Sequence, residues 1–333
     1  MTLPPTISYK WLWFFSGAAY GLFLRLVVVW LPLNVDGAMS LAFLVATPIA
    51  VGAITLFGLR HSVFTLRHMI FYPWVTVILM MLGAAISLLE GSICIALMSP
   101  LFLLLSSIGG LLMGCILKFT QRRSQPLAAF ALLPFIIALA EPQLPKAPHI
   151  IQIQRAVTVN APADVIWHQI VSAKQIHPDE LPMSMSHLIG VPKPVEGVNH
   201  MVDGKEIRYS VWEKGVNFQA EVIEKQYPRF IHWRYQFTEH SFPKGSMDDH
   251  VAIGGEFFNL LDTTFTLTPV NAQQTTLTLT AHYKIHSAIN FYAIPLSTVL
   301  GHDFVATILG LYQFRSEREV QQQVSRVSLL EHR

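Results

Sequence analysis

The chain of 333 residues is 52% hydrophobic and only 13% charged, with a formal net charge of +2 at pH 7. Its basic residues are scattered and form no stripe, which argues against nucleic acid as a partner. Both cysteines, Cys94 and Cys115, lie in one apolar run, which excludes a disulfide framework or a cysteine-based zinc site elsewhere. The length accommodates two units of unlike type. We expect a membrane domain at 1–145, a strand-rich domain at 146–325 and a polar tail at 326–333.

The first 145 residues contain five apolar stretches, which predict an α-helical transmembrane bundle. The first four are each long enough to cross a hydrocarbon core of about 30 Å. The fifth is shorter and contains Pro134, so a spanning and a re-entrant interpretation both stay open. The stretches are residues 11–33, 38–59, 71–89, 93–117 and 127–140.

The loops between these stretches differ in charge, and this difference predicts the orientation. If the segments alternate, all basic residues of the loops fall on one side, so the positive-inside rule makes the N-terminus cytoplasmic. Glu141 and a Pro-rich linker follow the fifth stretch without a basic cluster. We therefore expect the C-terminal domain outside the membrane, which means periplasmic for a protein of a bacterial inner (cytoplasmic) membrane. A cytoplasmic domain follows instead if the fifth stretch does not span. The basic residues are Lys10, Arg60, Arg67, Lys118, Arg122 and Arg123.

Two charges lie within or beside the apolar stretches. Arg25 falls inside the first, where an unpaired guanidinium is costly, and Glu90 lies at the end of the third. We hypothesise an intramembrane ion pair between them. In the alternative, the Arg25 side chain snorkels, so that its guanidinium reaches the membrane interface, and Glu90 is solvated.

From Ile151 onward the hydrophobic period changes to two, which predicts half-buried antiparallel strands joined by short turns. Residues 191–204 are predicted as a Pro- and Gly-marked loop. The last apolar stripe runs at helical spacing from Asn290 to about Gln323 and predicts one long helix. The predicted strands have their apolar residues at Ile151–Val159, Ile207–Val211, Phe218–Val222, Ile231–Phe237, Phe257–Leu267 and Leu277–Ile285.

The segment Val157–Trp167, followed by curved strands and a long last helix, resembles the START-like, or SRPBCC, superfamily. That superfamily includes polyketide cyclase/dehydrase-like and lipid-transfer proteins, and the resemblance covers residues 150–323. It implies an α+β helix-grip fold, in which a curved antiparallel sheet surrounds a long C-terminal helix with an apolar cavity between them. The segments Asp249–Asp262 and Asn290–Ala293, with Asp303, also resemble a bacterial subgroup that has a multi-span N-terminus and no assigned reaction.

The predicted strand faces separate an apolar interior from a polar exterior. His232, Arg234, Asp262, His282 and Lys284 fall on the face that points away from the cavity. The inward positions suit a lipid or another hydrophobic molecule. The expected ligand-binding side chains are Tyr209, Trp212, Phe218, Trp233, Tyr235, Phe257, Tyr283, Tyr292 and Phe304.

Polar groups must then reach the cavity from loops or from the last helix. Glu180, Asp303 and His250 are candidate acid–base groups, although Glu180 also fits a solvent carboxylate and Asp303 also fits an acceptor for loop donors. Arg208 and Lys193 are possible counter-charges. We expect no metal and no cofactor, because no compact ligand spacing or Gly-rich phosphate loop is present.

These observations favour an integral membrane protein whose START-like domain binds a hydrophobic ligand or lipid near the bilayer, for carriage, sensing or presentation. One alternative is an enzyme acting on a lipid or polyketide-like substrate through the loop and helix carboxylates. Another is a structural or assembly factor whose core is filled by its own side chains. The bilayer and a hydrophobic small molecule are the expected partners.

Overall fold

A computed structural model describes residues 8–30, 37–61, 65–119, 125–143, 147–248 and 253–331. The chain forms two compact units. Unit 1 comprises Met1–Ala147 together with Ser287–Tyr292, and unit 2 comprises Pro148–His286 together with Ala293–Arg333. The chain therefore passes from unit 1 to unit 2 near residue 147 and returns briefly to unit 1 at 287–292.

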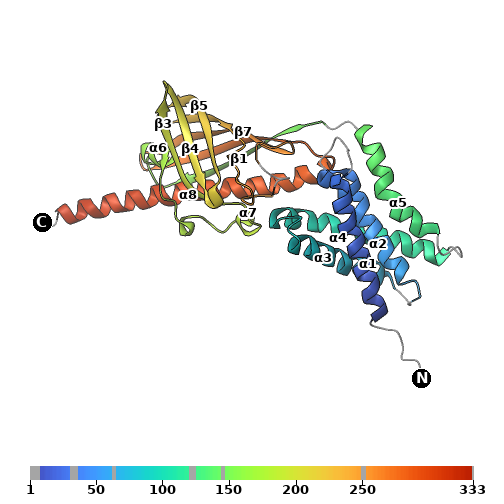
Figure 1. Ribbon diagram of the computed structural model, residues 1–333. Helices are drawn as coiled ribbons and strands as arrows, with labels where there is room; N and C mark the ends of the chain where they lie inside the picture. Colours follow the sequence, from blue (N-terminus) through green and yellow to red (C-terminus); the bar gives the residue numbers. More distant parts are fainter. Residues whose placement is uncertain are drawn as a thin grey trace. The chain divides into compact units, whose positions relative to one another are not determined.

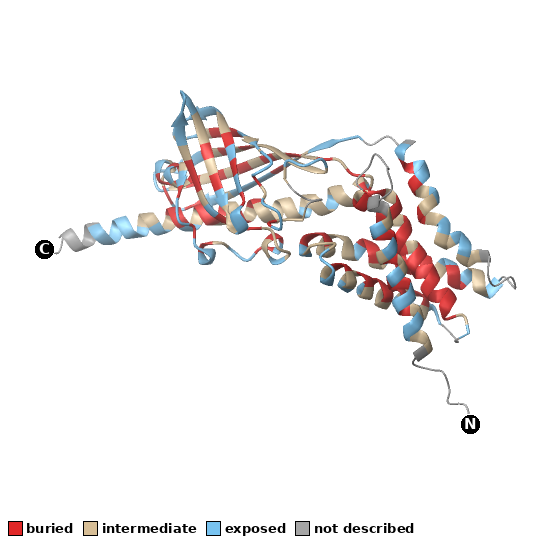
Figure 2. Cartoon of the chain, viewed as in Figure 1, coloured by how far each residue is buried: buried red, intermediate tan, exposed pale blue. Residues whose placement is uncertain are grey.

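Unit 1 is a bundle of helices with α2 at its centre. Almost every residue of α2 is buried, and this helix contacts α1, α3, α4 and α5 (Figure 2). A π-helical segment, Ala42–Ala46, leads directly into α2. The helices are α1 (Ser8–Trp30), α2 (Thr47–Gly58), α3 (Leu66–Ile86), α4 (Ser92–Phe119) and α5 (Gln125–Ala140).

Small residues let these helices approach closely, as glycines do in tightly packed bundles. A Cβ atom on Gly109 of α4 would lie 2.0 Å from the carbonyl oxygen of Ile49, and one on Gly52 of α2 would lie 2.0 Å from that of Ser106. Neither position therefore accepts a larger side chain without separating the backbones of α2 and α4.

Buried charges in unit 1 have partners. The Arg25 guanidinium donates to Glu90 Oε1, and it also donates to the carbonyl oxygen of Leu89 at 3.3 Å. The ion pair hypothesised from the sequence is thus present in the structure. Glu141 accepts backbone N–H groups from Leu41 at 2.9 Å and Ala42 at 3.2 Å. This carboxylate therefore caps the helical run that leads into α2, which is a role the sequence did not indicate.

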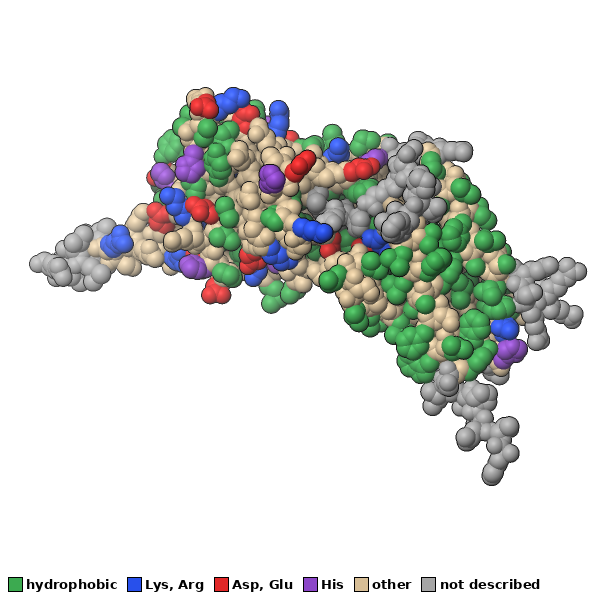
Figure 3. All heavy atoms as spheres, in the orientation of Figure 1, with side chains coloured by type: hydrophobic (Ala, Val, Ile, Leu, Met, Phe, Trp, Pro, Cys, Tyr) green, Lys and Arg blue, Asp and Glu red, His purple; other side chains and the backbone are tan. Residues whose placement is uncertain are grey.

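Among the described residues, three helical segments are long and apolar enough to cross a membrane by length and composition: Leu66–Ile86, Ser92–Phe119 and Asn290–Arg326. The run Ala42–Gly58 and helix α5 are apolar but shorter. On the face drawn in Figure 3, hydrophobic side chains cover much of unit 1, whereas charged and histidine side chains are spread over unit 2.

Unit 2 contains one eight-stranded antiparallel sheet, in the order β1-β8-β7-β6-β5-β4-β3-β2. The sheet curls around a long helix, α8, as Figure 1 shows. This curled half-barrel with its C-terminal helix fits the helix-grip arrangement. The strands are β1 (His149–Val159), β2 (Ser172–Ala173), β3 (Pro194–Val202), β4 (Lys205–Trp212), β5 (Asn217–Gln226), β6 (Phe230–Gln236), β7 (Phe258–Asn271) and β8 (Gln274–Ile285), and the helices are α6 (Ala163–Val171), α7 (Met185–Leu188) and α8 (Asn290–Glu331).

The apolar stripe of α8 packs against the inner face of the sheet. Val305, Leu309 and Tyr312 share one core with inward residues of β6, β7 and β8, such as Trp233 and Phe265. Other apolar residues of α8 stay exposed, such as Val299 (55%) and Phe314 (44%), and the helix is long and apolar enough to be a candidate span.

Two expectations about the strands were wrong. Residues 194–202 form β3 and not a loop, because Pro194 is at the first position of the strand and a bulge between Pro194 and Glu196 absorbs the irregular pattern. Strand β4 has the opposite phase to the one predicted. Arg208 and Ser210 are buried at 7% and 6% exposure, while Val211 is 41% exposed.

Candidate functional site

A cavity of about 130 Å³ lies between the inner face of the sheet and α8 in unit 2. Nine of the residues that line it are aromatic. Trp212 stacks on Phe304 of α8 with ring centroids 5.6 Å apart, and Phe218 contacts both Trp212 and Tyr235 at 5.8 Å. The aromatic residues of the lining are Trp212, Phe218, Trp233, Tyr235, Phe237, Phe242, Phe265, Phe304 and Tyr312.

Two charged side chains line this cavity, Glu196 and Arg208, and Arg208 enters because of the reversed phase of β4. Its Nη1 donates to the carbonyl oxygen of Ile170 at 2.7 Å and to Asn199 Oδ1 at 3.2 Å. Its Nη2 donates to the hydroxyl of Tyr312 at 3.1 Å, and its Cζ lies 4.7 Å from the centre of the Trp233 ring. The guanidinium is therefore fixed by neutral groups from β3, α6, α8 and β6.

Within the described part of the chain, no carboxylate lies within ion-pairing distance of Arg208. Glu206 approaches it indirectly through Asn199, but Glu206 is paired with Lys225 at 2.8 Å. The carbonyl of Ile170 lies in the last turn of α6, where the helix dipole contributes only partial negative charge. A buried cation with this environment favours an anion beside it.

Gly197 of β3 makes room for the guanidinium. A Cβ atom at this position would lie 2.2 Å from Arg208 Nη2, well inside van der Waals contact. Gly197 pairs with Ser210 of β4 and with Ala173 of β2. The absence of a side chain here therefore decides where the guanidinium head can sit.

Four hydroxyl groups also line the cavity, those of Ser210, Tyr235, Thr263 and Tyr312. The indole N–H of Trp233 donates to Tyr235 Oη at 3.1 Å, and Tyr235 Oη donates to Thr263 Oγ1 at 3.0 Å. Burial raises the pKa of the Tyr235 hydroxyl, despite the hydrogen bonds and the nearby Arg208 that act in the opposite direction. Tyr235 thus remains a neutral hydrogen-bonding group at neutral pH.

Five of the nine expected ligand-binding side chains line the cavity: Trp212, Phe218, Trp233, Tyr235 and Phe304. The other four do not, and each has a structural reason.

Tyr209 points to the other face of β4, where it contacts the ring of His200. Phe257 precedes β7, and Phe258 takes the inward position instead. Tyr283 packs on Phe258 and its hydroxyl pairs with Ser297 Oγ at 3.2 Å, away from the lining.

Tyr292 belongs to unit 1, where its hydroxyl donates to the carbonyl oxygen of Leu97 and its ring packs in the helical core. The prediction that it lines the cavity was wrong because residues 287–292 pack with unit 1.

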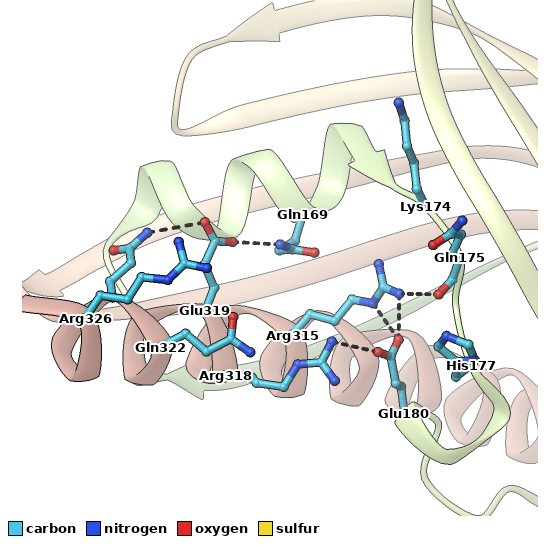
Figure 4. Close-up of a pocket in the computed structure, with 11 residues that line it drawn as sticks. Gln169, Lys174, Gln175, His177, Glu180, Arg315, Arg318, Glu319, Gln322 and Arg326 are labelled. Carbon is cyan, nitrogen blue, oxygen red and sulfur yellow. Dashed lines mark hydrogen bonds and ion pairs between the residues drawn. The ribbon is translucent and has the colours of Figure 1, made fainter. Parts of the chain in front are cut away.

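The candidate carboxylate Glu180 is 6% exposed and does not line the cavity. Its Oε2 accepts from Arg315 Nε at 2.7 Å, and its Oε1 accepts from Arg318 Nη2 at 2.9 Å (Figure 4). Both oxygens are therefore engaged by arginines of α8, which are 135 and 138 residues away in the sequence.

Asp303 lies on α8 and binds the segment that begins α7. It accepts hydrogen bonds from the hydroxyls of Ser184 and Ser186 at 2.7 and 2.8 Å and from the N–H groups of Met185 and Ser186 at 3.2 and 2.9 Å. Burial alone would raise the pKa of Asp303, but these hydrogen bonds outweigh it and lower the pKa below its ordinary value. Its contacts are those of an acceptor for loop donors. His250, the third candidate, lies outside the described residues.

On the outer face of the sheet, Asp262 Oδ1 contacts His282 Nδ1 at 2.7 Å and lies 3.7 Å from His232 Nε2. These residues point away from the cavity, as their strand positions predicted. No group of three His, Cys, Asp or Glu side chains in the described residues is arranged to hold a metal ion. Lys193, the second possible counter-charge, does not line the cavity.

No family model and no curated protein matches the chain. Several solved structures are similar to about half of the chain. They include the Zhui aromatase/cyclase from Streptomyces sp. R1128 (16% identity, 52% of this chain and 96% of that chain, TM-score 0.33). A START superfamily protein from Mycobacterium smegmatis is also similar (15% identity, 50% of this chain and 97% of that chain, TM-score 0.34). Truncated norcoclaurine synthase from Thalictrum flavum is similar as well (12% identity, 51% of this chain and 94% of that chain, TM-score 0.30). The strand order and α8 of this chain define the fold of unit 2.

Proposed function

We propose that unit 2 binds a compact hydrophobic molecule that carries one acidic group, and that Arg208 is the counter-charge for that group. The observation that carries this proposal is a guanidinium, 7% exposed, held at the wall of an aromatic cavity by neutral partners alone among the described residues. A ligand carboxylate would supply the missing negative charge, and charge-assisted hydrogen bonds of this kind are about twice as strong as neutral ones.

The size of the cavity limits the ligand. Its 130 Å³ is close to the roughly 150 Å³ of an engineered apolar cavity that takes up benzene. Drug-sized ligands usually need about 300 Å³ or more. The cavity therefore fits one ring or a short chain, and a lipid-sized ligand would require side chains such as Trp212 and Phe304 to move apart.

Binding is favoured over catalysis because the two described acid–base candidates have other partners. Glu180 is held by two arginines and Asp303 by the start of α7, and neither lines the cavity. The alternative of a core filled by its own side chains predicts no affinity for any small acid. A titration with a small acid therefore distinguishes that alternative from ligand binding.

The experiment is a titration of the detergent-purified full chain with benzoate and with its neutral analogue benzyl alcohol. Binding is monitored by tryptophan fluorescence, since Trp212 and Trp233 line the cavity. We expect saturable benzoate binding that Arg208→Met weakens by about thirtyfold or more, because truncating one partner of a buried charge pair costs about 2–5 kcal/mol.

The matched control is Arg155→Met, which removes an exposed arginine of β1 and leaves the cavity unchanged. Its affinity for benzoate should equal that of the wild type. Equal benzoate affinities in the wild type and Arg208→Met, or no saturable binding at all, would overturn the proposal.

We also propose that unit 1 is embedded in a bacterial inner membrane, with a cytoplasmic N-terminus and unit 2 on the periplasmic side. Supporting this, α3 and α4 are long and apolar enough to span, and large hydrophobic side chains such as Leu82 (53% exposed) and Leu104 (60% exposed) face outward from them. A reporter that is active only in the cytoplasm or only in the periplasm, fused after Arg333, tests the orientation. Cytoplasmic activity would contradict it.

A further inference from the structure

A second hollow of about 450 Å³ lies in unit 2 on the later turns of α8, apart from the aromatic cavity. We call it the basic pocket. Its wall is formed by α6, by the segment after β2, by the short 3-10 helix Pro178–Glu180 and by α8 (Figure 4). Its lysine, arginine and glutamate lining residues are Lys174, Glu180, Arg315, Arg318, Glu319 and Arg326.

The charges of the basic pocket do not balance. Four basic side chains line it, on Lys174, Arg315, Arg318 and Arg326, against the two carboxylates of Glu180 and Glu319, and His177 also lies in the lining. Two positive charges are therefore in excess in one confined hollow, where they raise the local concentration of anions.

The two central arginines are held in position before any ligand arrives. Glu180 engages Nε of Arg315 and one Nη2 hydrogen of Arg318, and the backbone carbonyl of Gln175 accepts from Arg315 Nη2 at 3.0 Å. Gln175 has φ = 48°, in the left-handed region that non-glycine residues rarely adopt. Strain at such a position is tolerated only where the surroundings impose it. The backbone here is bent so that its carbonyl meets the guanidinium.

Donors remain available for a ligand. Each guanidinium carries five N–H groups, and the Arg318 side chain is 50% exposed with one of its donors on Glu180. Arg326 and Lys174 are exposed at the rim. The side-chain amides of Gln169 and Gln322 also reach the pocket and add neutral donors or acceptors.

We propose that the basic pocket binds a phosphate monoester. A phosphate monoester carries about −1.5 to −2 charges at pH 7 and three acceptor oxygens, which matches the excess of two positive charges and the arginine forks. The volume of the hollow leaves room for a polar group attached to the phosphate, such as glycerol. The source is either a soluble phosphate ester or the headgroup of a lipid. This site is separate from the aromatic cavity and does not depend on the function proposed for it.

The test uses the full chain in detergent and isothermal titration with glycerol 3-phosphate, with glycerol as the neutral reference. We expect saturable binding of glycerol 3-phosphate and none of glycerol. Arg318→Gln and Arg326→Gln should each weaken it by roughly tenfold, the effect of losing one charged hydrogen-bonding partner. Arg326 is exposed, so its substitution leaves the Glu180 ion pairs intact and the fold unchanged.

Lys205→Gln is the matched control. Lys205 lies on β4, is 66% exposed and pairs with Glu221, so its loss lowers the net charge equally outside the basic pocket. The proposal is overturned if glycerol 3-phosphate does not bind saturably, or if Lys205→Gln weakens binding as much as the pocket variants do.

Short-chain dihexanoyl phosphatidate distinguishes the two sources. Tighter binding than glycerol 3-phosphate by tenfold or more, lost in Arg318→Gln, supports a lipid headgroup. Equal affinity of the two compounds supports a soluble phosphate ester.

Discussion

Gly197→Ala is the sharpest way to disturb the proposed ligand site without touching the charged residue itself. The new Cβ would lie 2.2 Å from Arg208 Nη2, whereas ordinary contact begins near 3.4 Å, so the guanidinium must retreat by about 1 Å. That retreat breaks the hydrogen bond between Nη2 and the Tyr312 hydroxyl. It also moves the charge away from the position where a ligand acid would meet it.

The expected effects on stability and on affinity differ. Removing a glycine from a strand contributes about 0.5–1 kcal/mol of stability, and the lost hydrogen bond costs about 0.5–1.5 kcal/mol, so the free energy of unfolding should change little. Affinity for benzoate should fall by roughly tenfold, since displacing one charged hydrogen-bonding group costs about 1.5 kcal/mol or more.

Tryptophan fluorescence titrations of a double-mutant cycle measure this directly. In an Arg208→Met background, Gly197→Ala should have no further effect on benzoate affinity, because the side chain that it displaces is gone. If Gly197→Ala leaves the affinity of the wild-type chain unchanged, or lowers it equally in both backgrounds, the assignment of Arg208 as the counter-charge is refuted.

Further predictions concern the cavity wall, the α7 segment and unit 1. Trp212→Ala should let 1-naphthoate bind at least about tenfold tighter than in the wild type, because a second ring adds apolar area that the enlarged cavity buries; unchanged affinity would show that the wall does not limit ligand size. Asp303→Asn should lower the free energy of unfolding by about 1–3 kcal/mol at pH 7. Because the folded pKa of Asp303 lies below the ordinary 3.8, its contribution is present above that value and lost as pH falls through the folded pKa, and chemical unfolding of the variant should lack this pH dependence. Arg25→Leu and Glu90→Leu should each destabilise unit 1 by about 3 kcal/mol in detergent melts, and the double variant should recover part of that loss; additive losses would contradict a pair. Gly109→Ala should lower the melting temperature through overpacking of about 1–3 kcal/mol, and an unchanged melt would contradict close contact of α2 and α4.

The periodic parts of the chain were predictable from the sequence. The stripe that begins at Asn290 predicts α8, and the alternation in β5, β6 and β8 predicts which side chains face inward. These elements could be predicted because the spacing of hydrophobic residues within a single stretch of sequence is enough to identify each of them.

The candidate site was harder to predict from the sequence, because the residues that form it are far apart in the chain. Arg208 looks like a surface residue in β4, where Ile207, Tyr209 and Val211 alternate with it. Its burial depends on Trp233 and Tyr312, which only the fold brings together. The hydrophobic period of one strand therefore does not reveal that Arg208 is buried.

The same limit applies to Glu180. Its flanking prolines and position in a loop indicate an exposed carboxylate near the cavity mouth, but Arg315 and Arg318 meet it from the far end of the chain. Only the consecutive charges around Arg318 in the sequence signalled a polar surface on α8, and they did not indicate what it faces.

The most direct test of the ligand proposal is native mass spectrometry of the full chain purified in mild detergent. We expect a small co-purified molecule that is hydrophobic and acidic, present in the wild type and in Arg155→Met and absent from Arg208→Met. Detection of the wild-type chain only at its unliganded mass, or a bound molecule that Arg208→Met retains in full, would contradict the ligand proposal.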